Sequence, residues 1–292
     1  MKRRFYQLDV FTRFRYQGNP LAVVTDADGL RSGRMQDIAR EMNLSETVFV
    51  QKPSTNRALA RLRIFTTTTE LPLAGHPVIG TWFLLGELGV VPAQEGAVRV
   101  LQQTGAGLLP VEIYFENGKP QLVTMTQRPA SFRAARLDRR KLAEALGLRP
   151  GDLHGKLPVE AVSTGIFNLM VPLARLSALS RIELNIPAFR KLLGKQHIMA
   201  YCFFVRGQQV RARGMLPWGI AEDPATGSAA GSLGAYLVRH GQIEPGRLLR
   251  IVQGVEMGRP SEIYVNVSRM GSRLVPRVSG AAVRVFEGHI EE

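Results

Sequence analysis

One short segment of this chain recurs 152 residues further along. The sequence ELPLAGHP at 70–77 aligns with EDPATGSA at 222–229, and a glutamate, a proline and a glycine coincide. Three identities in eight are weak by themselves, but each copy precedes a predicted helix that opens at the glycine. The repeat therefore predicts two similar α+β halves that face each other, each aiming a helix N-terminus at the cleft between them. Two unrelated helix starts are the alternative.

Hydrophobic patterning predicts strands and helices in a similar order in the two halves. For the first half we expect strands at 5–11, 21–24, 47–50, 58–65 and within 97–126, and helices at 32–42 and 74–88. For the second half we expect helices at 138–146 and 225–240 and strands at 159–164, 169–173, 200–205, 210–215, 248–252, 263–267 and 281–286. Ser32 is the expected N-cap of the first helix. The halves are assigned to 1–118 and 119–292, with the last strand a candidate to cross back to the first half.

The composition, 45% hydrophobic and 21% charged residues, is that of a folded globular protein. A net charge of +14 over 292 residues favours anionic partners. The basic residues are scattered without an aromatic-interleaved patch, however, so nucleic acid is the less favoured partner. The best apolar stretch, 82–91, is about ten residues long and contains Glu87, too short to span a membrane. We expect a cytoplasmic protein.

The single cysteine, Cys202, lies in the apolar run 200–205 and excludes an intrachain disulfide. A thiol in such a run is typical of a small core residue rather than a nucleophile. No HxxH, HExxH or clustered carboxylate motif occurs, so we expect no metal site.

The two predicted helix starts favour the binding of a small carboxylic acid. Unsatisfied N–H groups and a partial positive charge make a helix N-terminus an anion site. Gly75 and Gly227 lack a Cβ atom, which allows a carboxylate to approach the backbone, and Ser228 adds a hydroxyl donor. A plain helix start is the alternative for each glycine.

Three side chains are candidates for moving protons. His76 stands at the first of these helix starts and Asp223 just before the second, while Glu46 lies between the first helix and a strand. Each also has an ordinary interpretation: a structural histidine, a turn or cap aspartate, and a loop carboxylate.

Several segments together resemble the PhzF-like phenazine-biosynthesis family and occur in that family's order along nearly the whole chain. The segments are DVFT (9–12), GNPLAVV (18–24), MNLSETVF (42–49), ELPLAGHP (70–77), DPATGSAAG (223–231) and QGVEMGRPS (253–261). One departure is the run Thr66-Thr67-Thr68-Thr69, where the family commonly has a proline after the first threonine.

The resemblance implies the diaminopimelate-epimerase-like fold, with two pseudosymmetric halves, each a β-barrel-like sheet around a central helix, usually in a homodimer. It also implies isomerisation similar to that of trans-2,3-dihydro-3-hydroxyanthranilate, without cofactor or metal. Glu46 matches the family's catalytic glutamate, and His76, Asp223 and Ser228 match its supporting residues. Gly75 and Gly227 match the backbone that binds the carboxylate.

Two other functions stay open at this point. One is a one-base racemase or epimerase of a small amino acid. The other is a non-catalytic protein that binds nucleic acid or a metabolite. Racemisation by two thiols is disfavoured, because the helix starts offer His76 and Ser228 instead of cysteines.

Overall fold

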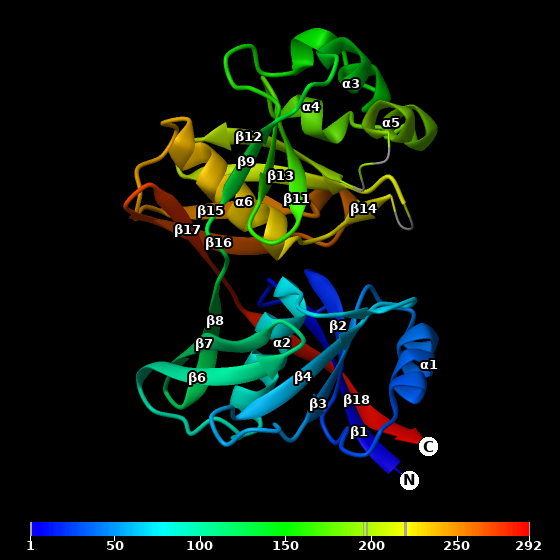
Figure 1. The fold of residues 1–292 in the computed structure, drawn as a ribbon, viewed down its shortest axis with the longest axis vertical. Helices are drawn as coiled ribbons and strands as arrows, with labels where there is room; N and C mark the ends of the chain where they lie inside the picture. The colour runs from blue at the N-terminus through cyan, green and yellow to red at the C-terminus, as the bar shows by residue number, and fades with distance from the viewer. Residues whose placement is uncertain (1, 195, 197, 219–220, 292) are drawn as a thin grey trace. The chain divides into compact units, whose positions relative to one another are not determined.

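The computed structural model describes residues 2–194, 196, 198–218 and 221–291 (Figure 1). The chain folds into two compact units: Met1–Thr126 with Ser279–Glu292, and Gln127–Val278. The division therefore follows Thr126, whereas the sequence analysis places it after residue 118, and the last strand belongs to the first unit.

In the residues that the structure describes, the first unit contains nine strands and two helices. The strands are β1 (Lys2–Val10), β2 (Asn19–Val24), β3 (Thr47–Gln51), β4 (Ala60–Phe65), β5 (Glu70–Leu71), β6 (Gly96–Thr104), β7 (Gly107–Glu116), β8 (Lys119–Thr126) and β18 (Ala282–Glu291). The helices are α1 (Ser32–Met42) and α2 (Gly75–Glu87). Strands β1 and β18, near the two ends of the chain, lie side by side and pair from Lys2 with Glu291 to Val10 with Ala282 (Figure 1).

The second unit contains the remaining elements. Its strands are β9 (Ser131–Ala134), β10 (Glu160–Ser163), β11 (Phe167–Pro172), β12 (Met199–Arg206), β13 (Gln209–Met215), β14 (Glu222–Asp223), β15 (Leu248–Gln253), β16 (Ser261–Met270) and most of β17 (Arg273–Gly280). Its helices are α3 (Arg139–Ala145), α4 (Ser177–Ser180), α5 (Ile186–Leu193) and α6 (Gly227–Arg239), with 3₁₀ turns η1 (Pro150–Asp152) and η2 (Val255–Met257).

Strand pairing repeats between the units in both order and sense. In the first unit β1–β2 is antiparallel, β2–β3 parallel, β3–β4 and β4–β5 antiparallel, and β4–β6 parallel. In the second unit β10–β11, β11–β12, β12–β13, β13–β14 and β13–β15 follow the same series. β18 joins β1 as β9 joins β10, antiparallel in each case. The structure thus repeats the fold as well as the sequence segment that precedes each central helix.

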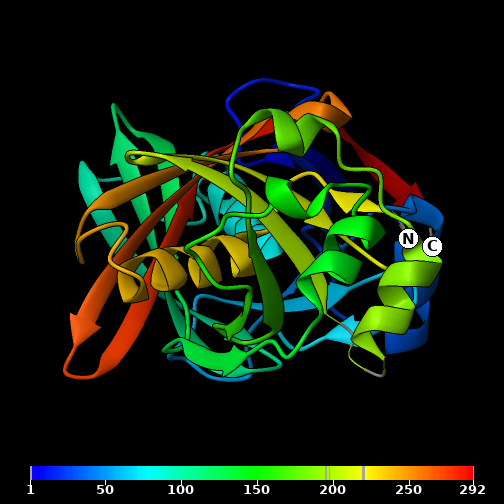
Figure 2. The ribbon, with the colours of Figure 1, turned by 90° about the horizontal axis from the view of Figure 1, so that it is seen from above.

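Each unit encloses one central helix. In α2 every residue from His76 to Gly86 is buried, and in α6 every residue from Ala229 to Val238 is buried. A helix that is apolar on all sides must be surrounded, and α2 packs against β8, β1, β2 and β18 of its own unit. Helix α6 lies along β16 and β10 of its unit (Figure 2). α1 instead buries one stripe, formed by Met35, Ile38 and Ala39.

The expected N-cap of α1 is wrong. Arg31 occupies the cap position, and Ser32 is the first residue of the helix. The Ser32 hydroxyl accepts a hydrogen bond from Arg63 on β4 at 2.9 Å instead of capping the first turn. A tertiary partner has therefore replaced the local interaction that the serine predicted.

Candidate active site

Glu46 is fixed by the end of α1 and the start of β3. Asn43 adopts the left-handed conformation, with φ 52°, and its N–H donates to Ala39 O, which ends the helix. β3 then begins at Thr47, which is fully buried. The Glu46 side chain is only 17% exposed. The sequence thus places this carboxylate in a short connection held at both ends.

His76 lies against Glu46 in the first unit. Its Nε2 atom is 3.4 Å from Glu46 Oε2, and both atoms are buried. Burial lowers the pKa of His76 to about 3, so the imidazole is neutral at pH 7. A neutral imidazole has one donor and one acceptor nitrogen. His76 can therefore offer Glu46 or a ligand a hydrogen bond, but not a full positive charge.

Neither central helix is capped by the side chain of its N-cap residue. Ala74 precedes α2 and has no acceptor, and the Thr226 side chain makes no cap hydrogen bond to α6. By contrast, Asp138 and Asn185 cap α3 and α5 through their side-chain oxygens. The first-turn N–H groups of α2 and α6 thus keep the character of an anion site.

Asp223 stands on β14, immediately before α6, and is held by residues of its own unit. Thr226 Oγ1 donates to Asp223 Oδ2, and Gln253 Nε2 donates to the Asp223 carbonyl oxygen at 2.8 Å. The fully buried Gln253 also accepts a hydrogen bond from Tyr201 Oη at 2.8 Å. Asp223 is therefore part of a network of buried polar groups.

The first turn of α6 is held from outside the helix as well. Gln127 Nε2 donates to Gly227 O at 2.9 Å, and Thr164 Oγ1 donates to Ser228 O at 3.3 Å. These bonds fix the carbonyl groups of Gly227 and Ser228, two of the three residues that are expected to bind the substrate. The tip of α6 is consequently placed by two segments of its own unit.

The six predicted site residues divide equally between the units. Glu46, Gly75 and His76 are in the first unit, and the structure brings Glu46 and His76 together. Asp223, Gly227 and Ser228 follow one another at the start of α6 in the second unit.

Sequence reasoning missed three residues of the Asp223 network. Thr226 and Gln253 lie inside two of the recognised segments, 223–231 and 253–261, so their position in a motif was an available signal. Tyr201 lies in none of the segments and looks like any apolar strand residue, and only its contact with Gln253 reveals it.

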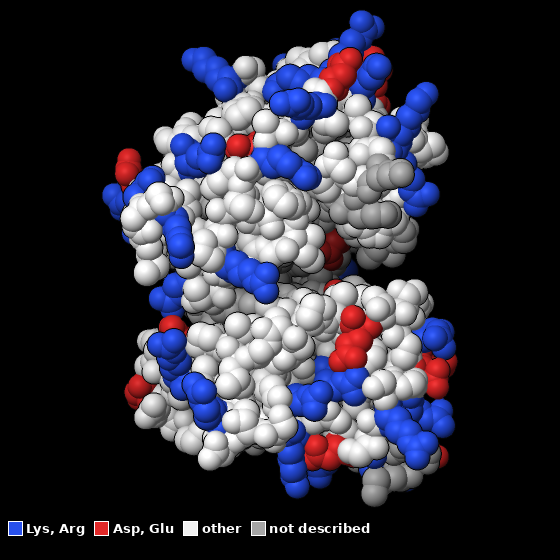
Figure 3. All heavy atoms as spheres, viewed as in Figure 1, with Lys and Arg blue, Asp and Glu red and all other residues white. Residues whose placement is uncertain are grey.

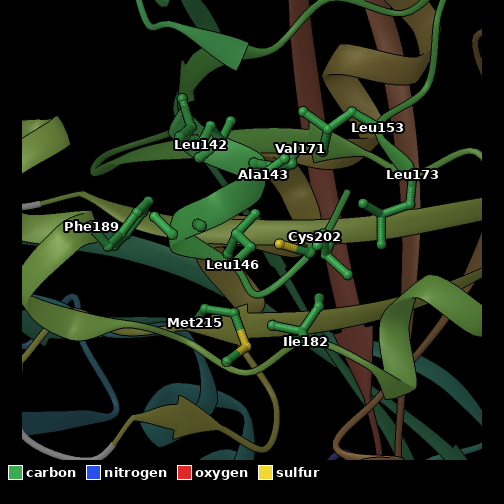
Figure 4. Close-up of a cluster of buried hydrophobic side chains, with 14 of the residues drawn as sticks. Leu142, Ala143, Leu146, Leu153, Val171, Leu173, Ile182, Phe189, Cys202 and Met215 are labelled. Atoms are coloured by element: carbon green, nitrogen blue, oxygen red, sulfur yellow. The ribbon is translucent and has the colours of Figure 1, made fainter. Parts of the chain in front are cut away.

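Cys202 lies in a hydrophobic cluster of the second unit, among Leu146, Ile182 and Met215 (Figure 4). Burial raises the pKa of the thiol to about 12, which keeps it protonated. Within the described part of the chain, no group of three or more His, Cys, Asp or Glu side chains is arranged to hold a metal ion.

Basic side chains do not gather into one patch on the face drawn in Figure 3, where Lys and Arg are separated by uncharged residues and by Asp and Glu. Among the described residues, no helix is both long enough and apolar enough to cross a membrane.

The fold is of the diaminopimelate-epimerase-like class. A probable proline racemase from Agrobacterium radiobacter shares it, with a TM-score of 0.70 at 15% identity over 99% of this chain and 93% of that one. A PhzF-family phenazine biosynthesis protein from Bacillus anthracis superposes with a TM-score of 0.91 at 29% identity, with both chains covered in full.

Residues 8–288 match the family of phenazine biosynthesis-like proteins, and the chain belongs to this family. It is 38% identical over 287 residues to the trans-2,3-dihydro-3-hydroxyanthranilate isomerase of Pseudomonas aeruginosa, with 98% of both chains covered. The protein is an enzyme of the isomerase type.

Proposed function

We propose that this enzyme isomerises a small cyclic or unsaturated amino or hydroxy carboxylic acid, similar to trans-2,3-dihydro-3-hydroxyanthranilate, without a cofactor. The relative from Pseudomonas aeruginosa that acts on that compound supports this substrate class. The observation that carries the proposal is the contact of 3.4 Å between Glu46 and a buried, neutral His76.

In the proposed reaction Glu46 is the base and then the acid. The ionised carboxylate removes the proton from ring carbon C3, and the protonated carboxyl group returns it at C1. The product is an enol, which becomes a ketone. General acid–base transfer of this kind accelerates a reaction by about 10²- to 10⁴-fold.

The neighbouring groups position the substrate. His76 is neutral at pH 7, so it can form a hydrogen bond with the substrate's amino or hydroxyl group without forming a full ion pair with Glu46. Asp223 is assigned the same kind of contact. The N–H groups at Gly75, Gly227 and Ser228 bind the carboxylate, a role supported by the uncapped starts of α2 and α6.

The test is turnover of trans-2,3-dihydro-3-hydroxyanthranilate in heavy water, followed by mass spectrometry and NMR. The wild type should form the ketone and place at least part of the solvent deuterium at C1. Glu46→Gln, which cannot accept the proton, should lose about 10³-fold or more in kcat while KM changes little.

Glu41→Gln is the matched control, because Glu41 is an exposed glutamate near the same end of α1. Its turnover should equal that of the wild type. Unchanged turnover in Glu46→Gln would remove Glu46 from the mechanism. Small amino acids are incubated in heavy water in parallel, and deuterium uptake by one of them, with no turnover of the dihydro compound, would favour the one-base racemase instead.

Two further expectations belong to this proposal: a homodimer and a cytoplasmic location. Sedimentation at several protein concentrations tests the first, and fractionation of the producing cells tests the second.

A further inference from the structure

The internal repeat allows the site in the second unit to be compared with its structural counterpart in the first. Across the sheet of the second unit, Tyr201 pairs with Gly214 and Gly214 pairs with Asp223. The equivalent row in the first unit is Val48, Ile64 and Leu71, paired in the same way.

The N-cap residues also differ in polarity: the polar Thr226 precedes α6, and the apolar Ala74 precedes α2. The first unit thus builds the same strands and a central helix of the same length with apolar side chains at these positions. Polar groups here are not a requirement of the fold.

A missing side chain creates the space for those polar groups. A Cβ atom at Gly214 would lie 3.1 Å from Gln253 Nε2 and 3.2 Å from Thr226 Oγ1, closer than ordinary van der Waals contact. At the equivalent place in the first unit Ile64 is fully buried and occupies the corresponding volume. The glycine therefore leaves room for an amide and a hydroxyl beside Asp223.

The hydrogen bonds among these groups have a defined direction. The Thr226 N–H can only donate and the Asp223 carbonyl can only accept, which fixes the orientation of the Gln253 amide between them. Gln253 Oε1 accepts from Tyr201 Oη and from Thr226 N, and Nε2 donates to Asp223 O and Thr226 Oγ1. All four positions of this buried amide are satisfied.

The same reasoning gives the direction of the hydrogen bond between Thr226 and the Asp223 carboxylate. Thr226 Oγ1 accepts a hydrogen bond from Gln253 Nε2 and donates its own proton to Asp223 Oδ2 at 2.5 Å, a length typical of a charge-assisted hydrogen bond to a carboxylate. Thr226 makes no cap hydrogen bond to α6, so its hydroxyl is not engaged by the helix and can donate to Asp223.

We propose that Tyr201, Gln253 and Thr226 form a buried donor relay that orients the Asp223 side chain and holds it as a hydrogen-bond acceptor toward the substrate. This inference rests on the proposed function, in which Asp223 handles the amino or hydroxyl group of the substrate. Thr226 and Gln253 are positioning residues in it and do not themselves react.

The charged groups around Asp223 are compatible with an acceptor role. On β12, Tyr201 is fully buried, and burial together with the Asp223 charge raises the pKa of its phenol, so it remains a donor. Glu222, the neighbour of Asp223 on β14, is bound in two places by Arg213 of β13, at 2.9 and 2.7 Å. Its charge is thereby largely balanced.

The main test substitutes Thr226 with valine, which keeps the shape and removes the donor. The acidic limb of the pH profile of kcat/KM should move upward by about one pH unit, and kcat/KM at pH 7 should fall by about 10- to 100-fold, as expected for loss of a hydrogen bond to a charged group. Thr226→Ser, which restores the hydroxyl, should return both values to within about threefold of the wild type.

A second measurement needs no turnover. The carboxyl carbon of Asp223, labelled with ¹³C and assigned by comparison with Asp223→Asn, should titrate at higher pH in Thr226→Val than in the wild type. Thr124→Val is the matched control, because it removes a half-buried hydroxyl that bonds Ser279, and both residues belong to the first unit, whereas Asp223 is in the second. It should leave the titration unchanged.

The outcomes separate this inference from the proposed function. An unchanged Asp223 titration and pH profile in a folded Thr226→Val variant would overturn the relay even if the isomerase is active. A wild type without isomerase activity would overturn the proposed function, while the shifted carboxyl titration would still support the relay. In an active enzyme, Thr226→Val should add little to the loss caused by Asp223→Asn, since both act through one carboxylate.

Discussion

Burial in the first unit lowers the proton affinity of His76, which lies in the first turn of α2. The result is a histidine that stays neutral across the physiological range, although it touches a carboxylate. Contact with an acid is therefore a poor guide to the charge of this histidine, and burial decides it.

This shift predicts a pH-dependent stability. The pKa of His76 falls from 6.5 to about 3 on folding, so between these values the unfolded chain binds more protons than the folded one. The free energy of unfolding should therefore decrease on acidification through this range, by up to about 1.4 kcal/mol per pH unit from this residue. Urea unfolding at pH 4 to 7.5 measures it.

His76→Gln should flatten the slope in that range, whereas His289→Gln, at an exposed histidine on β18, should leave it as in the wild type. Equal slopes in the wild type and His76→Gln would mean that His76 titrates normally.

At the scale of elements, an arginine in each unit ties the strand that leads into the central helix to a helix on the periphery. Arg63 on β4 binds Glu70 of β5 with two nitrogens, at 2.8 and 2.6 Å, and reaches Ser32 of α1. Arg213 on β13 binds Glu222 of β14 in the same bidentate manner and also donates to the carbonyl of Leu179 in α4. The fold thus repeats this connection along with its strands.

The two arginines should differ in their contribution to stability. The side chains of Arg213 and Glu222 are 10% and 11% exposed, but Glu70, the partner of Arg63, is 41% exposed. Removing one partner of a buried pair leaves the other charge unpaired, so Arg213→Met should cost about 3 kcal/mol or more. Arg63→Met should cost about 1 kcal/mol, because water can solvate Glu70. Denaturant unfolding compares them, and equal losses would contradict the argument.

Local patterns predicted most elements well and failed where a distant partner decides. Helix α1 has the expected bounds because its apolar stripe at Met35, Ile38 and Ala39 has helical spacing. Its N-cap was wrong because Arg63, distant in sequence, binds Ser32. Helix α5 was not predicted, although Asn185 before Ile186-Pro187 is a typical helix start and its side chain caps the helix.

For the site, the recognised segments identified residues but not their contacts. Glu46 and His76 are thirty positions apart, and their distance of 3.4 Å depends on how β3 and α2 pack in the first unit. Tyr201 was missed because a buried tyrosine in an apolar strand has no local signature of a polar role. Its hydroxyl acquires one only through Gln253, fifty-two residues away in sequence.

At the scale of the whole molecule, duplication and divergence are both visible. The two units share their strand order, but one offers Glu46 with a neutral histidine and the other an aspartate backed by a polar network. The apolar row of Val48, Ile64 and Leu71 indicates the form that this fold takes without the network.

The pairing of β18 with β1 sets an order for synthesis. The second unit is one continuous stretch, Gln127–Val278, so all of it is translated before Ala282–Glu291. The first unit must wait, because β1 receives one of its two neighbours only from Ala282–Glu291. A chain truncated after Gly280 and released from the ribosome should accordingly protect the amides of β12 and β13 from hydrogen exchange, while those of β1 exchange faster than in the full chain. The part of the protein made first is thus completed last.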